Sequence, residues 1–355
     1  MKNTEQTSYT GKEVFIGIDV HKKSYSVVAR CDKEVVKKWT TTASPQELSQ
    51  QLQKYFRGAL VYSVYEAGFS GFALHRELVK HGIKNIVVHA ASIEVAVNDR
   101  VKTDKRDAEK MAALLEAGRL KGNRIPTEVE ERRRMLTRTR QQLVEERTAI
   151  KNKIRMKFHQ LGLIKYDENR AMSHKLVKEL LNGADSSEFR IVIQAYWNIW
   201  KKLDEEICNL ASAIKEQVKT DPHDATYRSA PGVGPLSARI LANELGDMSQ
   251  FKNERQLFSY TGLTPCEYSS GENIRRGHIS RQGNSRLRAI LVESAWRAIG
   301  KDRALGEFFE RLYPRTGKKR AIVAVARKLI GRIRAAFHQG VNYQMEYQVS
   351  QALTT

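Results

Sequence analysis

Cysteine is scarce in this sequence, and its three cysteines lie far apart. Cys31, Cys208 and Cys266 form neither a disulfide framework nor the paired spacing of a zinc site. Because thiols stay free in reducing compartments, this usage indicates a cytoplasmic protein. Long apolar runs are missing too: no stretch reaches the roughly 18 residues of a membrane span, and the first residues lack the apolar core of a signal peptide. We therefore expect neither a membrane protein nor a secreted one.

Acidic residues are also in short supply relative to basic ones. The chain has 40 Asp and Glu against 61 Lys and Arg, a formal net charge of +21. So large an excess repels itself unless a polyanion neutralises it, which makes nucleic acid the expected partner. With 41% hydrophobic and 28% charged residues, the 355-residue chain is globular and long enough for two or three domains.

The first ninety residues alternate between apolar strands and amphipathic helices. Strands are predicted at 14–20, 24–30, 34–40, 60–66 and 85–89, with helices at 45–57 and from the turn at 68–71 to His81. Ser44 and Pro45 open the first helix as cap and first helical residue. A three-strand meander followed by alternating helices and strands is the order of a ribonuclease-H-like α/β fold.

Four acidic residues of this region are candidates for metal ligands. Asp19 and Glu66 each end a predicted strand, and the carboxyl ends of strands are where open α/β sheets place their sites. Asp104 and Asp107 are three residues apart on one face of a predicted helix. Carboxylates brought together repel one another without cations, so we expect Mg²⁺, as two ions, with Mn²⁺ as an alternative.

Each of these acids also has a simpler interpretation. Asp104 and Asp107 fit ordinary helix capping, where negative charge favours the positive end of the helix dipole. Asp19 and Glu66 can mark the points at which two strands reach water. The metal hypothesis therefore depends on the four acids in combination.

The middle of the chain is predicted to form two long amphipathic helices. They span 128–161 and 189–218, joined by a polar connection at 166–187, and this arrangement suggests an antiparallel coiled coil used in oligomerisation. Its charged positions fit a solvated face better than a nucleic-acid site. Trp197 and Trp200 are expected in the core or in oligomer contacts.

Basic residues gather around the acids and in the C-terminal third. The turn at 231–234 resembles the hairpin of a helix-hairpin-helix element, although such turns also simply pack two helices. A loop at 262–288, punctuated by glycine, and a basic, amphipathic tail helix at 318–338 follow. The candidate nucleic-acid contacts are Lys102, Lys105, Arg106, Arg275, Arg276, Arg281, Arg286 and Arg288.

Five motifs in order along the chain carry a family resemblance. They are Ile16-Gly17-Ile18-Asp19-Val20, Glu66-Ala67-Gly68, Lys102 to Ala108, Pro231-Gly232-Val233-Gly234 and Gly262 to Arg288. Together they resemble the DEDD transposases of bacterial insertion sequences, the bridge-RNA-guided recombinases related to Piv-type DNA invertases. The resemblance implies a RuvC-like catalytic domain at 1–125, a coiled coil at 126–222 and a C-terminal transposase domain at 223–355.

The resemblance also implies a mechanism. Asp19, Glu66, Asp104 and Asp107 correspond to the four catalytic acids, and Ser270 to a nucleophilic serine, with the adjacent Ser269 leaving that choice open by one residue. The implied partners are double-stranded DNA at the element ends and target, a non-coding guide RNA and further copies of the chain, from dimer to tetramer, at the bacterial nucleoid. A hydrolytic resolvase or nuclease and a non-catalytic nucleic-acid-binding protein remain the alternatives.

Overall fold

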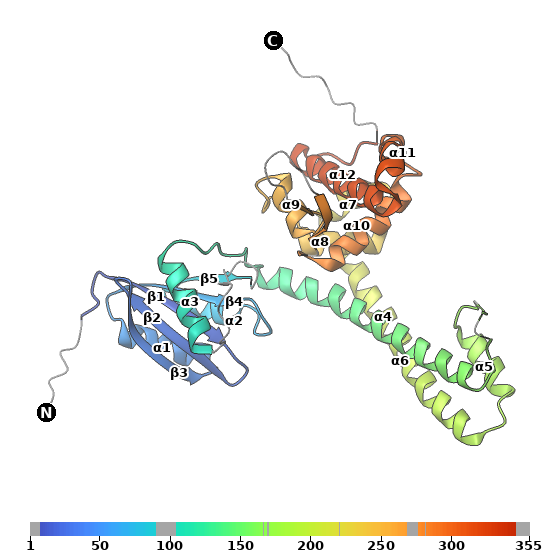
Figure 1. The fold of residues 1–355 in the computed structure, drawn as a ribbon, viewed down its shortest axis with the longest axis horizontal. Helices are drawn as coiled ribbons and strands as arrows, with labels where there is room; N and C mark the ends of the chain where they lie inside the picture. The colour runs from blue at the N-terminus through green and yellow to red at the C-terminus, as the bar shows by residue number, and fades with distance from the viewer. Residues whose placement is uncertain are drawn as a thin grey trace, which may run out of the picture. The chain divides into compact units, whose positions relative to one another are not determined.

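The computed structural model describes residues 8–89, 104–165, 167–168, 170–219, 221–267, 276–280 and 282–345. The chain divides into two compact units, Met1–Ile125 and Pro126–Thr355. The first is α/β, and within the described ranges the second is almost entirely helical (Figure 1).

The first unit is built on a mixed five-stranded sheet. Its elements are β1 (Glu13–Val20), β2 (Ser24–Cys31), β3 (Glu34–Thr42), α1 (Pro45–Tyr55), β4 (Leu60–Glu66), α2 (Ala73–Lys80), β5 (Lys84–Val88) and α3 (Asp104–Glu116). The strand order is β3-β2-β1-β4-β5, in which the first three strands are antiparallel and β4 and β5 run parallel to β1. The meander and the alternation predicted from the sequence are confirmed, with Ser44 as the cap of α1.

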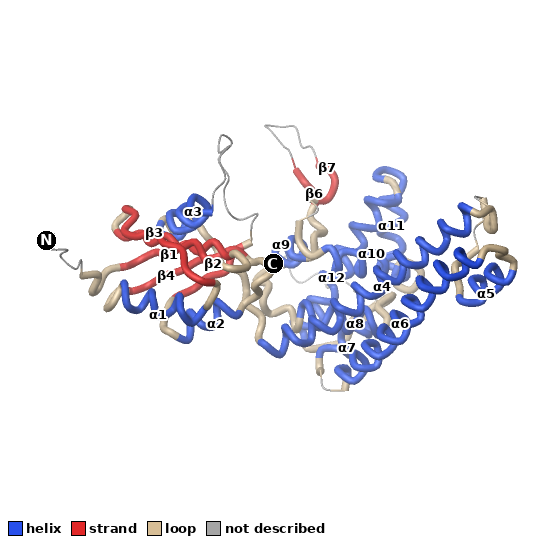
Figure 2. The backbone as a smooth tube through the Cα atoms, turned by 90° about the horizontal axis from the view of Figure 1, so that it is seen from below, coloured by secondary structure: helices blue, strands red, loops and turns tan. Residues whose placement is uncertain are grey.

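Helices cover both faces of this sheet. Figure 2 shows α1 and α2 on one side and α3 on the other. Ile16 and Ile18 of β1 pack with Leu48 of α1 and Leu74 of α2 in one buried cluster, and Val64 of β4 is buried in a separate cluster with residues of α3. Because side chains alternate along a strand, the odd-numbered residues of β1 face α3.

The second unit begins with a helical hairpin. Its helices are α4 (Glu128–Gln160), α5 (His174–Asn182) and α6 (Ser187–Val218). A capping box of Thr127 and Glu130 starts α4, and α4 and α6 lie side by side in antiparallel directions (Figure 1), joined by an ion pair from Arg147 to Asp204 at 2.9 Å. Trp200 is buried in the core between them, as predicted. Antiparallel pairing is thus observed, while true coiled-coil packing stays a prediction.

The connection between these helices corrects one expectation. The sequence analysis treats 166–187 as a polar connection, but the structure places α5 within it, capped by Ser173. Leu176 and Val177 are buried against the hairpin, and Leu180 and Leu181 pack beside them. The apolar face of a nine-residue helix is simply too short to stand out from its polar flanks.

The remaining elements form the C-terminal part of the second unit. They are α7 (His223–Ser229), α8 (Pro235–Leu245), α9 (Glu254–Tyr260), β6 (Pro265–Glu267), β7 (Arg276–Ile279), α10 (Ser285–Ala298), α11 (Arg303–Thr316) and α12 (Lys318–Gln339). One buried cluster unites these helices, and α12 contributes much of it, including Val325 and Leu329. The predicted tail helix is confirmed. Among the described residues, no helix is long and apolar enough to cross a membrane.

Ion pairs to buried carboxylates hold α4 to this C-terminal part. Glu244 of α8 accepts two hydrogen bonds from Arg138 of α4, at 2.7 and 2.8 Å. Nearby, the carboxylate of Asp221 contacts the guanidinium groups of Arg133 and Arg239. The hairpin and the C-terminal helices are therefore held together by directional contacts as well as by apolar packing.

Candidate functional site

The position of α3 is set by a glycine in the central strand. Gly17 lies on the face of β1 that α3 covers, and a Cβ there would overlap the carbonyl oxygen of Ala108 and approach the amide nitrogen of Ala112 to 2.7 Å. Ala108 and Ala112 are fully buried. Small residues on both sides therefore let the helix backbone rest on the strand.

Two ion pairs fix the same helix to the meander. Arg30 of β2 donates from Nε to Glu116 at 2.7 Å, and both side chains are largely buried. Lys38 of β3 contacts Glu109 at 2.7 Å in a more exposed pair. These two contacts fix the position of α3 on the sheet, and the first turn of α3 lies over the carboxyl end of β1.

Three side chains meet at that end of the sheet. Nε2 of His21 lies 3.1 Å from the carboxylate of Asp19 and 3.0 Å from that of Asp104. One ligand-type atom from each residue lies within 4.8 Å of the other two. The Nε2 atom is shielded from water, yet neither contact has hydrogen-bond geometry. The sheet and α3 thus bring together two of the predicted acids and one imidazole.

The electrostatics of Asp19 reflect this crowding. Burial raises the pKa of its carboxyl above the usual value, and the charges of Asp104 and Asp107 raise it further, while His21 lowers it. Three carboxylates thus interact around the end of β1. Such a cluster favours a bound cation, because a cation is the simplest way to keep all of them ionised.

Glu66 and Asp107 lie beside this cluster without belonging to it. Among the described residues, the group that could hold a metal comprises only Asp19, His21 and Asp104. Glu66 is the last residue of β4. Ile18 of β1 pairs with Tyr65 of the parallel strand β4, so Glu66 follows Tyr65 at the level where Asp19 follows Ile18. Alternation from Val64 puts its side chain on the α3 face, and it is exposed there. Its role as a ligand stays a prediction.

His21 was missed by the sequence analysis, although a signal existed. It stands two residues after Asp19, a spacing that puts two side chains on the same side of an extended chain. Imidazole and carboxylate together form a common ligand set for divalent metals. The pattern Asp-x-His at the end of a buried strand was therefore available as a metal signal.

The predicted basic residues are only partly described. Arg106 is exposed on the first turn of α3. Arg286 is half-buried near the start of α10, and Arg288 donates to the carbonyl oxygens of Gly262 and Gln282 at 3.3 and 3.4 Å. The predicted site residues Lys102, Ser269, Ser270, Arg275 and Arg281 lie outside the described residues, as do the side chains of Lys105 and Arg276.

The two serines fall between β6 and β7, whose pairing forms a short antiparallel hairpin. The turn between β7 and α10 is anchored by its own contacts. Asn284 donates from its backbone to Tyr260 at 2.8 Å and from its side chain to Glu244 at 3.3 Å. Gly283 has φ of +82°, and a Cβ there would overlap backbone atoms of the preceding turn. The turn that precedes α10 is thus tied to the end of α9, to α8 and, through Glu244, to α4.

The glycine turn at 231–234 serves packing at one of its glycines. Gly232 has φ of +77°, and a Cβ there would overlap the carbonyl oxygen of Ser294 in α10. This close contact agrees with the simpler of the two interpretations of the turn, in which it packs two helices together. Gly234, by contrast, has open space around it at the start of α8, so only this end of the turn is free for an anion.

Comparison with known proteins bears on both units. Residues 16–162 match the transposase family DEDD_Tnp_IS110, and residues 225–310 match the transposase family IS116/IS110/IS902. The protein y4qE of Sinorhizobium fredii, which carries a transposase name, is 33% identical over 298 residues, covering 80% of this chain and 72% of its own. The transposase of insertion sequence element IS1111A from Coxiella burnetii is 28% identical over 261 residues, covering 72% and 71%.

A third relative is aligned with this chain over a larger share of its own length. The transposase of insertion sequence element IS1533 from Leptospira borgpetersenii is 25% identical over 307 residues, which is 80% of this chain and 85% of the relative. The matched regions include the end of β1, the whole of α3 and the segment that carries the two serines. The chain therefore belongs to the IS110/IS116/IS902 family of transposases, enzymes that cut and rejoin DNA.

Proposed function

We propose that this transposase cuts DNA at a Mg²⁺ site formed by Asp19, Glu66, Asp104 and Asp107, with Ser270 as nucleophile. The observation that supports it most is the meeting of Asp19 and Asp104, which come from different elements, on one imidazole nitrogen. The strand order, with three antiparallel strands followed by two parallel ones, fits a RuvC-like, ribonuclease-H-like catalytic domain.

The described residues fit a divalent cation. The donors at the end of β1 are carboxylate oxygens and one imidazole nitrogen, and that nitrogen is buried without a hydrogen bond. Carboxylates suit Mg²⁺ and Mn²⁺, and an added imidazole favours Mn²⁺ more than Mg²⁺. When bound, such cations neutralise the phosphodiester and stabilise both the entering and the leaving oxygen.

The protein's own groups then have distinct tasks. Asp19 and Asp104 would hold the cation that binds the scissile phosphate, and the packing of α3 on Gly17 fixes the positions of these two side chains. The hydroxyl of Ser270 gives its proton to water and forms a bond to phosphorus, while the bond from phosphorus to the 3′ oxygen breaks and that oxygen takes up a proton from water, so no proton is gained or lost overall. The products are a 5′-phosphoserine and a 3′-OH. Because the ester is conserved, the strands can rejoin without an external energy source.

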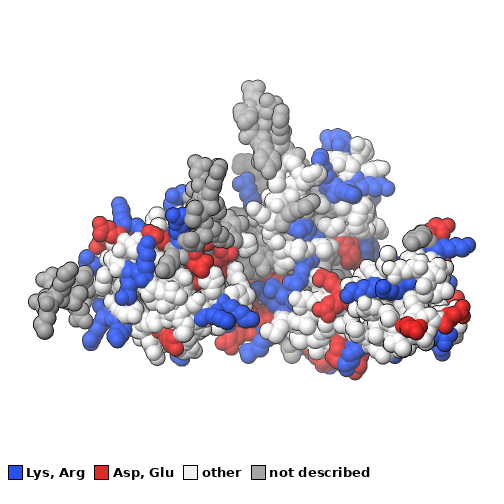
Figure 3. All heavy atoms as spheres, turned by 60° about the horizontal axis from the view of Figure 1, so that its bottom comes forward, with Lys and Arg blue, Asp and Glu red and all other residues white. Residues whose placement is uncertain are grey.

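Guide RNA and oligomerisation belong to the same proposal. On the face drawn in Figure 3, basic side chains are scattered over both units instead of forming one stripe. Scattered positive charge suits backbone contacts, with sequence recognition delegated to a base-pairing RNA. We further infer that several copies of the chain assemble on the DNA, and that the helical hairpin contributes to that assembly.

The proposal is tested by trapping the covalent product. Wild-type protein incubated with Mg²⁺, its guide RNA and the element ends should give a DNA–protein adduct that survives denaturation, and mass spectrometry should place the nucleotide on Ser270. Ser270→Ala should abolish cutting and the adduct, because no other hydroxyl can take its in-line position. Ser269→Ala is the matched control and should cut nearly normally.

Two outcomes would contradict this mechanism. If Ser270→Ala still cuts, water is the nucleophile and the enzyme acts as a hydrolytic nuclease. If the adduct maps to Tyr268 or to Ser269, the attacking hydroxyl has been assigned to the wrong residue.

A further inference from the structure

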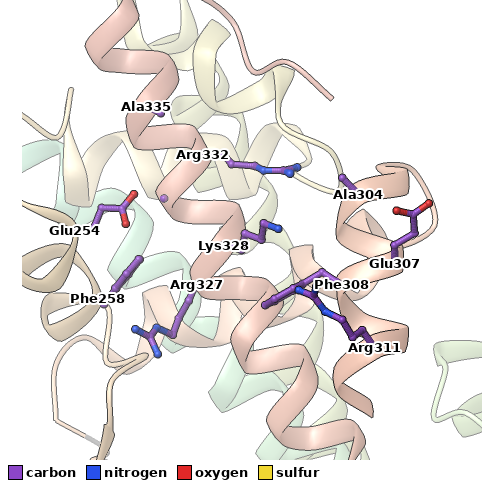
Figure 4. Close-up of a pocket in the computed structure, with 11 residues that line it drawn as sticks. Glu254, Phe258, Ala304, Glu307, Phe308, Arg311, Arg327, Lys328, Arg332 and Ala335 are labelled. Carbon is purple, nitrogen blue, oxygen red and sulfur yellow. The ribbon is translucent and has the colours of Figure 1, made fainter. Parts of the chain in front are cut away.

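A second site candidate lies in the C-terminal part of the protein, within one unit. A cavity of about 630 Å³ opens between α9, α11 and α12 (Figure 4). Its volume is within the range of small-molecule pockets and corresponds to roughly one or two nucleotides. No residue of the proposed metal site lines it.

Two aromatic rings stand in the wall of this cavity, each with a cation over it. The guanidinium of Arg327 lies 4.7 Å from the ring centre of Phe258. The ammonium of Lys328 lies 4.5 Å from the ring centre of Phe308, and Arg311 lies 5.5 Å from the same ring. Both phenylalanines are only partly buried. Flat, π-rich surfaces are therefore combined with positive charge, which is the composition of sites that bind unstacked nucleotides.

The charge of the cavity is unbalanced toward the positive. Arg332 is paired with the buried carboxylate of Asp302 at 2.9 Å, and the lining carboxylate of Glu307 is bonded to Arg303 at 2.8 Å. Glu254 supplies the other lining carboxylate.

Lys328 shows the effect of this imbalance. Its ammonium is partly desolvated, and this burial, together with the charges of Arg332 and Arg311, lowers its pKa. The positive groups thus repel one another across the cavity. An anion placed among them would relieve that repulsion.

We propose that this cavity binds an unpaired nucleotide of a single-stranded nucleic acid, with Arg311 and Lys328 on the phosphate and the base against the Phe258–Arg327 pair. A phosphate supplies the missing negative charge, and a base supplies a flat surface for the ring and the guanidinium plane. The inference stands on the cavity's own residues and requires neither the metal site nor Ser270. Binding should consequently persist in EDTA.

The test measures binding of a labelled oligothymidine of about 12 nucleotides to the full-length protein in EDTA. Arg311→Gln with Lys328→Gln should weaken binding at least tenfold and flatten the slope against salt by about 1.4, since each single-strand phosphate contact contributes about 0.7. The control pair is Arg315→Gln with Lys319→Gln, which removes two exposed charges from the same helices outside the cavity.

Two further arms separate the sources of the nucleotide. An oligouridine of the same length shows whether RNA or DNA is preferred. The affinity for a duplex of the same length should fall equally in the cavity variants and in the control variants.

Phe258→Leu keeps every charge but removes the flat ring, and it should weaken single-strand binding by about tenfold. Melting temperatures of all variants establish that they fold.

A crosslink on the unmodified protein completes the test. An oligonucleotide carrying 5-iodouracil should, on irradiation, attach to the peptide of α9 that contains Phe258. Three results would each overturn the inference: an equal loss of single-strand affinity in the cavity pair and the control pair, an equal loss of duplex and single-strand affinity in the cavity pair, or crosslinks that leave out the peptide of α9.

Discussion

Replacing Gly17 with alanine tests how the acids are brought together. A Cβ at this position would lie 2.7 Å from the amide nitrogen of Ala112 and would overlap the Ala108 carbonyl oxygen. Since non-bonded atoms rest at about 3.5 Å, α3 must move outward by roughly 0.8 Å or more. Overpacking of this kind costs about 1–3 kcal/mol of unfolding free energy. A displacement of about 1 Å at a catalytic group costs about a hundredfold in rate.

Gly17→Ala should therefore cut element ends about a hundredfold more slowly, and urea unfolding should show the loss of stability. The control is Gly183→Ala, because Gly183 has φ of −89° and the nearest atom to a Cβ there is 3.8 Å away. That variant should be normal in both assays. If Gly17→Ala keeps wild-type stability and cleavage, the close contact between β1 and α3 does not position the acids.

Three further predictions address charge. His21→Ala leaves the carboxylates of Asp19 and Asp104 facing each other. The melting temperature should therefore fall in EDTA, by an amount worth less than about 1 kcal/mol, and it should recover when Mg²⁺ is added. An equal fall in melting temperature with and without Mg²⁺ would contradict this. Burial pushes the pKa of Asp221 up, but the amide of His223 and the guanidinium of Arg239 lower it below its usual value. The stability that Asp221 contributes is thus present above about pH 4 and is lost as the pH falls through its folded pKa. Asp221→Asn should cost about 3–5 kcal/mol of unfolding free energy at pH 7, and the unfolding free energy of the variant, measured in urea, should depend less on pH in the acid range. An unchanged pH dependence would show that other groups cause the acid sensitivity. Neutralising Arg275 and Arg276 should reduce the salt slope of duplex binding by roughly two, and an unchanged slope would show that neither contacts phosphate.

The fold of the first unit was readable from the sequence because its signals are local. Buried strands are continuous apolar runs, and their order with the helices determines which strands can pair. The short helix α5 escaped prediction because its apolar face of Leu176, Val177, Leu180 and Leu181 gains its meaning from packing against α4 and α6. Tertiary context of this kind leaves little trace in a nine-residue window.

The candidate site was predictable in its acids but not in its geometry. Asp19 and Asp104 were chosen by residue type and by place in an element, and the structure brings them together. What brings them together is the missing side chain of Gly17, which the sequence shows only as one glycine among 22. His21 was not predicted as a ligand because the carboxylates alone carried the metal hypothesis.

The Asp104→Asn variant is the decisive experiment for the proposed metal site. Asparagine keeps the size of the side chain at the first residue of α3, but it removes the negative charge that faces His21 and Asp19. Cleavage of element ends should be assayed with increasing Mg²⁺ and Mn²⁺, beside the melting temperature and duplex binding. If Asp104 is a metal ligand, cleavage is lost while folding and duplex binding stay at the wild-type level. Normal Mg²⁺-dependent cleavage by Asp104→Asn would contradict the proposed metal site and leave Asp104 only as a favourable charge at the start of α3.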